Sequence, residues 1–176
     1  MDLKNYVKDV KDFTIEGILF RDVTPLLQDK DAYKYAVDEI AEYARSKGAE
    51  VVVGPESRGF IVGCPVAYAL NAGFVPVRKP NKLPRKTISY KYDLEYGTAT
   101  LEMQKGAIKP NDRVLIIDDL LATGGTVGAV IDLVKKCKAI PVAAAFVINL
   151  SFLPGEKILT KKHRIPVFSL LEYDHE

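Results

Sequence analysis

Short apolar runs alternate with amphipathic segments along much of this chain, and this feature limits its possible folds most strongly. Residues 113–117 form an apolar, β-rich run typical of a strand buried on both faces, and residues 127–137 have helical spacing. The same patterns predict further strands over 51–53, 74–77, 141–150 and 166–173, and further helices over 31–47 and 59–70. This alternation indicates an α/β domain with a mostly parallel central sheet flanked by helices.

Two segments between these units alternate apolar and polar residues instead. Ile88, Tyr90 and Tyr92 alternate with polar residues in 86–92, and a similar pattern occupies 98–103. These two strands are predicted to form a β-arm around residues 93–97. The sequence contains no internal repeat, low-complexity tract or linker rich in Pro, Gly and Ser, so we expect residues 1–176 to form a single domain.

The composition is that of an ordinary globular protein with little net charge. Among 176 residues, 25 Lys and Arg oppose 23 Asp and Glu, which gives a formal net charge of +2. This balance argues against a general nucleic-acid or anionic-membrane surface, so we expect neither partner and only local electrostatic roles.

Export and membrane insertion are not expected either. Residues 1–13 intersperse charged and apolar side chains, and the most apolar windows of the chain span about a dozen residues, whereas a membrane span needs about 20. Cys64 and Cys137 lie within apolar segments, and we interpret them as reduced thiols in the core. These features favour a cytoplasmic protein.

The most informative segment for chemistry is Ile-Asp-Asp-Leu-Leu-Ala-Thr-Gly-Gly-Thr at residues 117–126. Gly124 and Gly125 let backbone N–H groups approach an anion, Thr123 and Thr126 add hydroxyl donors, and the following helix contributes its positive N-terminal end. These features predict a phosphate-binding turn. Because the P-loop and dinucleotide fingerprints are both absent from it, ATPase and dehydrogenase interpretations lose support.

Two carboxylates, Asp118 and Asp119, precede this turn. Carboxylates accept hydrogen bonds well from the vicinal hydroxyls of a ribose, so a sugar and its 5′-phosphate can share one loop. The alternative is that the two Asp residues merely terminate the strand and that Gly124-Gly125 makes a tight turn. The ten-residue pattern as a whole favours the sugar phosphate.

Two further segments carry charge near predicted strand ends. Glu56-Ser57-Arg58-Gly59 follows a strand and opens a helix, which suits either a second anion site or a surface ion pair made by Arg58. Residues 78–91 contain six basic side chains and no acidic one. Such a segment is usually a solvated loop, and the alternative of single-stranded nucleic acid stacked on Tyr90 and Tyr92 conflicts with the small net charge.

Residues 114–126 resemble the phosphoribosyl-diphosphate signature of the type I phosphoribosyltransferases. Residues 16–22, 54–60 and 94–97 resemble the same family in the same order, and the similarity extends from about residue 5 to 173. The Gly-Ile-Leu-Phe-Arg-Asp stretch at 17–22 is similar to that of the adenine-specific members. The resemblance implies the type I phosphoribosyltransferase fold, residues about 80–97 as a mobile lid, and conversion of adenine and 5-phospho-α-D-ribose 1-diphosphate (PRPP) to AMP and diphosphate in purine salvage.

The resemblance also implies roles for individual residues. Leu19 C=O and Arg21 N–H would read the adenine edge, with Phe20 stacked on the ring and Leu120 beside it. Glu95 would lie near N7 of adenine and Tyr96 would cover the reacting centre. The ribose and 5′-phosphate would contact Asp118, Asp119, Ala122, Thr123, Gly124, Gly125 and Thr126. The diphosphate would contact Glu56, Ser57, Arg58, Arg78, Lys79 and Lys82, and the Glu56–Ser57 peptide would be cis.

The same resemblance implies a homodimer and a Mg²⁺ ion carried by the diphosphate of the substrate. His163 and His175 have no partner at metal-ligand spacing, so the sequence predicts no metal site of the protein itself. Asn81 stands where the family often has Gly, which bears on the flexibility of the lid. Two rival functions are a PRPP-sensing regulator of the same fold and a phosphoribosyltransferase for 6-oxopurines.

Overall fold

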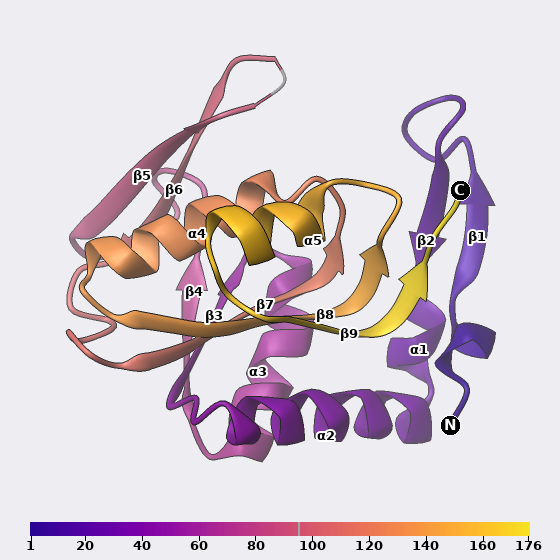
Figure 1. Ribbon diagram of the computed structural model, residues 1–176, viewed down its shortest axis with the longest axis horizontal. Helices are drawn as coiled ribbons and strands as arrows, with labels where there is room; N and C mark the ends of the chain where they lie inside the picture. The colour runs from indigo at the N-terminus through magenta and orange to yellow at the C-terminus, as the bar shows by residue number, and fades with distance from the viewer. Residues whose placement is uncertain (95) are drawn as a thin grey trace.

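The computed structural model describes residues 1–94 and 96–176, and its centre is a five-stranded sheet with helices on both faces (Figure 1). The strand order is β4 (Gly73–Val77), β3 (Val51–Pro55), β7 (Arg113–Leu121), β8 (Ile140–Leu150) and β9 (Val167–Tyr173). Each neighbouring pair in this sheet is parallel. The predicted α/β class with a parallel central sheet is therefore confirmed.

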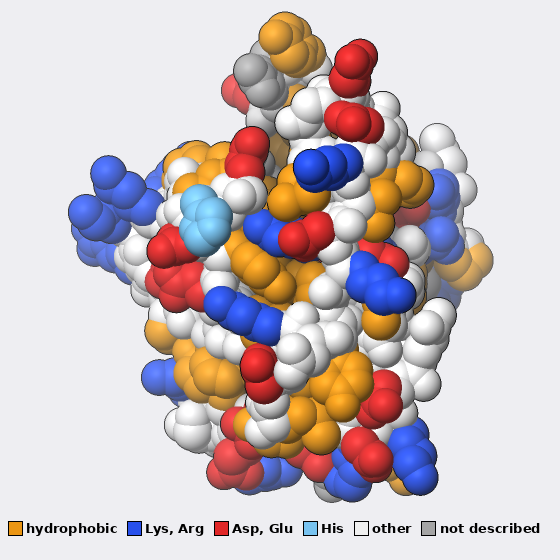
Figure 2. Space-filling view, turned by 90° about the vertical axis from the view of Figure 1, so that its right-hand side faces the viewer, with side chains coloured by type: hydrophobic (Ala, Val, Ile, Leu, Met, Phe, Trp, Pro, Cys, Tyr) orange, Lys and Arg blue, Asp and Glu red, His pale blue; other side chains and the backbone are white. Residues whose placement is uncertain are grey.

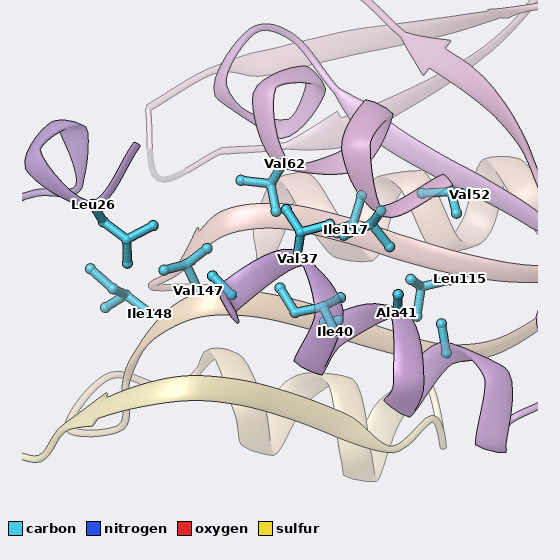
Figure 3. Packing of buried hydrophobic residues seen from close by; sticks show 14 of the residues in the cluster. Leu26, Val37, Ile40, Ala41, Val52, Val62, Leu115, Ile117, Val147 and Ile148 are labelled. Atoms are coloured by element: carbon cyan, nitrogen blue, oxygen red, sulfur yellow. The ribbon is translucent and has the colours of Figure 1, made fainter. Parts of the chain in front are cut away.

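The helices form one layer on each face of the sheet. The helices α1 (Thr24–Gln28), α2 (Lys30–Ser46) and α3 (Arg58–Leu70) cover one face, and α4 (Gly125–Lys136) covers the other with α5 (Gly155–Lys157) and the π-turn η2 (Ile158–Lys162). Strand β7 alternates between the two layers. Its Leu115 and Ile117 pack with α2 and α3 (Figure 3), whereas its Val114 and Ile116 pack with α4.

Local sequence explains where α2 begins and ends. The Asp29 carboxylate accepts hydrogen bonds from the N–H groups of Asp31 and Ala32 and so caps the helix. Buried side chains recur along one stripe that packs on the sheet, including Ala36 and Ile40. The helix ends just before Gly48, whose φ of +66° suits a glycine after a helix.

Two antiparallel hairpins lie outside the central sheet. The predicted β-arm is confirmed as β5 (Thr87–Asp93) paired with β6 (Thr98–Gln104). The second hairpin, β1 (Lys8–Lys11) with β2 (Leu19–Asp22), follows the short 3₁₀ turn η1 (Leu3–Tyr6) and was not predicted. All four residues of β1 are exposed, so this strand has no alternating hydrophobic pattern to reveal it.

Two predictions need correction. Strand β7 was predicted to end at residue 117, but it continues to Leu121 because Asp118, Leu120 and Leu121 stay paired with β8. The prediction of two core thiols was wrong, since Cys64 is exposed and Cys137 is half-buried; both are free. Helix α3 buries Val62, Gly63, Val66 and Ala67 and turns Cys64 outward.

The surface agrees with the small net charge. Figure 2 shows the side that carries β1, β2 and the C-terminus, and basic, acidic and hydrophobic side chains are interspersed over it. Within the described ranges, no helix combines the length and the apolar character that a membrane span requires.

Candidate active site

The end of β7 and the segments that follow β3 and β7 form one pocket at the carboxyl edge of the sheet. Strands β3 and β7 are parallel neighbours, so their carboxyl ends lie at the same edge. The pocket has a volume of about 300 Å³. It is lined by Glu56, Arg58, Asp118, Asp119, Leu120, Leu121, Ala122, Thr123, Gly124, Gly125, Thr126 and Val127. Every residue predicted to contact the ribose and the 5′-phosphate therefore lines this pocket.

The two glycines of the turn serve different purposes. Gly124 has a φ of +82°, and a Cβ there would lie 3.0 Å from Cα of Gly155, so the position needs glycine for both conformation and packing. A Cβ on Gly125 would have no atom within 4 Å. Helix α4 begins at Gly125, and its first N–H groups have no partner within the helix. The turn can therefore hold an anion at the open side of Gly125.

The two carboxylates lie inside the end of β7 and differ in their surroundings. Asp119 is only 4% exposed, and its Oδ2 lies 3.0 Å from Nε of Arg58. Oδ1 of Asp118 accepts a hydrogen bond of 2.8 Å from the N–H of Asp119. Burial, together with the charge of Asp119, raises the pKa of Asp118 to about 8. Asp118 can therefore be protonated near neutral pH and both donate and accept hydrogen bonds.

Glu56 forms hydrogen bonds with three of the basic residues that were predicted to bind diphosphate. Its carboxylate accepts hydrogen bonds from the N–H of Lys79 at 2.7 Å, Nζ of Lys82 at 2.9 Å and Nε of Arg78 at 3.3 Å. Burial acts to raise the pKa of Glu56, but the hydrogen bonds from Lys82 and Lys79 and the nearby positive charges lower it below its ordinary value. The Glu56–Ser57 peptide is cis, as the resemblance implied.

A second pocket of about 350 Å³ surrounds the ring of Phe20. Its lining is mainly apolar and consists of Val10, Phe13, Phe20, Asp22, Val23, Thr24 and Arg58. The rings of Phe13 and Phe20 are 5.0 Å apart, and the Arg58 guanidinium carbon lies 5.6 Å from the centre of the Phe20 ring. Because Arg58 lines both pockets, the aromatic pocket adjoins the pocket of the phosphate-binding turn.

The free edge of β2 carries backbone groups beside the Phe20 pocket. The N–H of Asp12 donates to the C=O of Ile18 at 3.1 Å, which identifies a hydrogen-bonded pair at the end of the β1–β2 ladder. Hydrogen-bonded and non-hydrogen-bonded pairs alternate along an antiparallel ladder. The backbone groups of Leu19 and Arg21 therefore point away from β1 and are available to a ligand.

Two predicted residues lie apart from these contacts, and a third prediction falls outside the described residues. Leu120, predicted to contact adenine, lines the pocket of the phosphate-binding turn and not the Phe20 pocket. Tyr96 is 89% exposed and lines a cavity of about 730 Å³ between the β-arm and α4, which the turn residues Thr123–Gly125 also border. The prediction for Glu95 concerns a residue outside the described residues.

Sequence reasoning missed two residues that complete the site. Gly155 donates its N–H to the C=O of Ala122 at 3.0 Å, and a Cβ on Gly155 would lie only 2.4 Å from that oxygen. The only sequence signal for this close approach is the Pro154-Gly155 turn dipeptide. Phe13 lies in a charged segment and gave no signal, although its ring packs against Phe20.

Metal-binding side chains do not cluster in the described part of the chain: no group of three or more His, Cys, Asp or Glu there could hold an ion. His163 is buried beside Asp132, with Nδ1 and Oδ1 3.6 Å apart, and lies by the β-arm cavity.

Comparison with known proteins assigns this arrangement to a family. Residues 25–173 match the phosphoribosyl transferase domain family. The adenine phosphoribosyltransferase of Thermoanaerobacter pseudethanolicus is 42% identical, with a TM-score of 0.92 over 98% of each chain. That of Rhodothermus marinus is 46% identical, with a TM-score of 0.90 over 97% of this chain and 96% of the other.

A third similar structure was solved with ligands. The Saccharomyces cerevisiae adenine phosphoribosyltransferase, in complex with D-2,5-dideoxy-2,5-imino-altritol 1,6-bisphosphate and adenine, is 37% identical, with a TM-score of 0.89 over 97% of each chain. These matches extend over nearly the whole chain and agree with the signature at 114–126. The chain belongs to the phosphoribosyltransferase family and, within it, to the adenine phosphoribosyltransferases.

Proposed function

We propose that this protein transfers the phosphoribosyl group of PRPP to N9 of adenine and releases AMP and diphosphate in purine salvage. The observation that carries the proposal is the junction at Arg58, where an aromatic pocket adjoins a pocket with two carboxylates and a phosphate-binding turn. A purine nucleotide has a base that suits the aromatic pocket, ribose hydroxyls that suit the carboxylates and a 5′-phosphate that suits the turn. The adenine bound to the similar yeast enzyme supports the choice of base.

The ribose 5-phosphate part of PRPP would occupy the pocket after β7. Asp118 and Asp119 would accept hydrogen bonds from the 2′- and 3′-hydroxyls, and a protonated Asp118 could also donate one. Residues Ala122 to Thr126 would surround the 5′-phosphate with backbone N–H groups and the hydroxyls of Thr123 and Thr126.

The diphosphate would bind between the start of α3 and the basic segment. Arg58, Arg78, Lys79 and Lys82 supply the positive charge, and the N-terminal end of α3 at Ser57 adds backbone donors. A carboxylate repels diphosphate, so we assign Glu56 the role of holding the basic groups in place.

Mg²⁺ would enter together with the diphosphate and neutralise charge on this leaving group. The carboxylates at the pocket fit this arrangement. Asp119 is paired with Arg58, and Glu56 is paired with Lys82 and Arg78, so the inner ligands of the ion would come mainly from the substrate.

Adenine would stack on Phe20 and be read by the open edge of β2. The C=O of Leu19 accepts a hydrogen bond from the 6-amino group, and the N–H of Arg21 donates one to N1. A 6-oxopurine presents the opposite pattern and leaves buried groups unpaired, at a cost of roughly 1 to 3 kcal/mol each. Leu120 would contact the base from the end of β7.

Catalysis would rest on positioning and on exclusion of water. The transition state has oxocarbenium character at C1′, and no covalent enzyme intermediate is needed. Residues about 80–97, which include β5 of the β-arm, would act as the mobile lid, with Tyr96 covering the reacting centre. Glu95 would hold or exchange the purine proton at N7 as N9 attacks C1′.

We further propose that the chain acts as a single domain, as a homodimer, and in the cytoplasm. The two free cysteines suit a reducing compartment. Light scattering should return about twice the 19.5 kDa mass of one chain. An active monomer would contradict the dimer.

A direct assay tests the proposed function. The purified protein is incubated with PRPP, Mg²⁺ and labelled adenine, hypoxanthine, guanine or uracil in separate reactions. We expect AMP from adenine and little product from the other bases. Product from a 6-oxopurine alone would assign the enzyme to another substrate, and absence of product with retained PRPP binding would favour a regulator.

A further inference from the structure

The side chain of Arg21 is buried at a point where three distant segments meet. It is 8% exposed, its Nη1 forms an ion pair with Asp9, and its Nη2 donates to the C=O of His175 at 3.4 Å. Its guanidinium carbon lies 4.1 Å from the centre of the Tyr173 ring. Arg21 therefore joins β2 to β1 and to the end of β9.

This side chain lies on the opposite face of β2 from the aromatic pocket. Side chains of neighbouring residues alternate across a strand, so the ring of Phe20 enters the pocket while Arg21 points toward the C-terminus. Figure 1 shows the C-terminus lying beside β1 and β2. The side chain of Arg21 is thus held on one face of β2, while its backbone N–H lies at the free edge of the same strand.

This contact is made by the most buried residue of the β1–β2 hairpin. Strand β2 has four residues, and Arg21 is the one that is buried. Its partner β1 is exposed throughout. Tyr173 belongs to β9, which is hydrogen-bonded into the central sheet. Arg21 therefore connects a hairpin whose other strand residues are exposed or half-buried to a strand of the central sheet.

We propose that the Arg21 side chain is a positioning residue for base selection, held by Asp9, Tyr173 and the His175 carbonyl. This inference rests on the proposed function, because it concerns the strand edge that would read adenine. A guanidinium can stack on an aromatic ring and form hydrogen bonds at both ends of its fork, whereas an ammonium cannot do both. When this clamp is lost, the β2 edge shifts and its hydrogen bonds to the base weaken.

The consequence is specific to one substrate. The pocket that would hold PRPP is built from the loops after β3 and β7 and contains no residue of β2. A displaced β2 should therefore raise KM for adenine and reduce discrimination against hypoxanthine while KM for PRPP stays near that of the parent. A merely structural role would lower stability and the amount of active enzyme without separating the two KM values.

The test compares Arg21→Lys, Tyr173→Leu and Tyr173→Phe with the parent protein. Arg21→Lys and Tyr173→Leu should raise KM for adenine about tenfold or more and lower the adenine-to-hypoxanthine ratio of kcat/KM, with KM for PRPP changed less than about twofold. Tyr173→Phe keeps the ring face and should behave like the parent. Lys4→Ala is the matched control, because Nζ of Lys4 lies 5.4 Å from the centre of the same ring and Lys4 belongs to η1, outside the β1–β2 hairpin.

Unchanged KM for adenine in both Arg21→Lys and Tyr173→Leu would overturn the proposal, as would an equal rise in both KM values. If Arg21→Lys does not fold, the Tyr173 pair still decides the question. A parent protein that uses another base would instead contradict the proposed function, and the same comparison with that base then tests the clamp.

Discussion

Nε of Arg58 lies 3.0 Å from Oδ2 of Asp119, so the first residue of α3 is paired with a carboxylate at the end of β7. The two residues are 61 positions apart, and the parallel pairing of β3 with β7 brings them together. The same guanidinium faces the Phe20 ring. Arg58 therefore links the proposed sites of ribose, diphosphate and base.

Replacement of Arg58 should impair the use of both substrates. Arg58→Met leaves the buried Asp119 carboxylate without its partner and removes one wall of each pocket. We expect kcat/KM to fall about 100-fold for adenine and for PRPP, and Arg58→Lys to recover only part of it. Steady-state kinetics checks this, and a loss confined to one substrate would contradict the linking role.

Asp118→Asn should stabilise the protein and weaken PRPP binding. The pKa of Asp118 is raised from an ordinary 3.8 to about 8, so the folded state binds this proton more tightly than the unfolded state does. The parent therefore loses stability as pH rises between these values, whereas the Asn variant does not. The advantage in Tm of Asp118→Asn should grow up to about pH 8, by roughly 2–4 °C per kcal/mol.

The same variant should bind PRPP or AMP about tenfold more weakly by calorimetry, because an amide NH2 group, which cannot accept a hydrogen bond, replaces one carboxyl oxygen that would face the ribose hydroxyls. Asp38→Asn is the control, since that carboxylate is exposed and forms only a surface pair with Lys34. A Tm difference that does not vary with pH, or an unchanged affinity, would contradict the assignment of Asp118.

The two glycines of the turn offer a test that separates folding from binding. Gly124→Ala introduces a Cβ at a φ of +82° and 3.0 Å from Gly155, so it should destabilise the protein by about 1–3 kcal/mol and weaken phosphate binding. Gly125→Ala meets no atom within 4 Å and should keep the parent Tm. Its Cβ should nevertheless reduce AMP affinity if the phosphate binds there. An unchanged AMP affinity in Gly125→Ala would show that the phosphate binds at another position.

Glu95→Gln tests the proposed proton transfer at N7. The variant keeps the shape of the side chain but cannot hold the purine proton, so kcat should fall about 100-fold with a smaller change in either KM. Single-turnover rates measured across the active pH range check this. Rates equal to those of the parent would contradict proton transfer by Glu95, and catalysis would then rest on the positioning of the two substrates.

The central sheet and the phosphate-binding turn could be predicted because their signals are local. Apolar runs define β3, β7 and β8, and the pattern at residues 117–126 contains its own glycines and carboxylates. The pairing of Arg58 with Asp119 and the clamp around Arg21 could not be predicted, because each depends on segments that meet only in the folded chain. The role of Glu56 was hidden for the same reason.

The hydrophobic pattern of the sequence also gave wrong or no predictions where tertiary packing decides which residues are buried. The β1–β2 hairpin lacks hydrophobic alternation in β1, yet it forms one wall of the Phe20 pocket. Cys64 lies in an apolar segment, but the face of α3 that carries it points away from the sheet.

A crystal structure of the protein with AMP tests the whole site most directly. The account predicts the adenine ring stacked on Phe20 with its 6-amino edge toward Leu19 and Arg21, the ribose at Asp118 and Asp119, and the phosphate at residues 123–126. Arg58 should lie where the base pocket meets the ribose pocket, beside the glycosidic bond. AMP bound with its base in the cavity between the β-arm and α4, away from Phe20, would contradict this account.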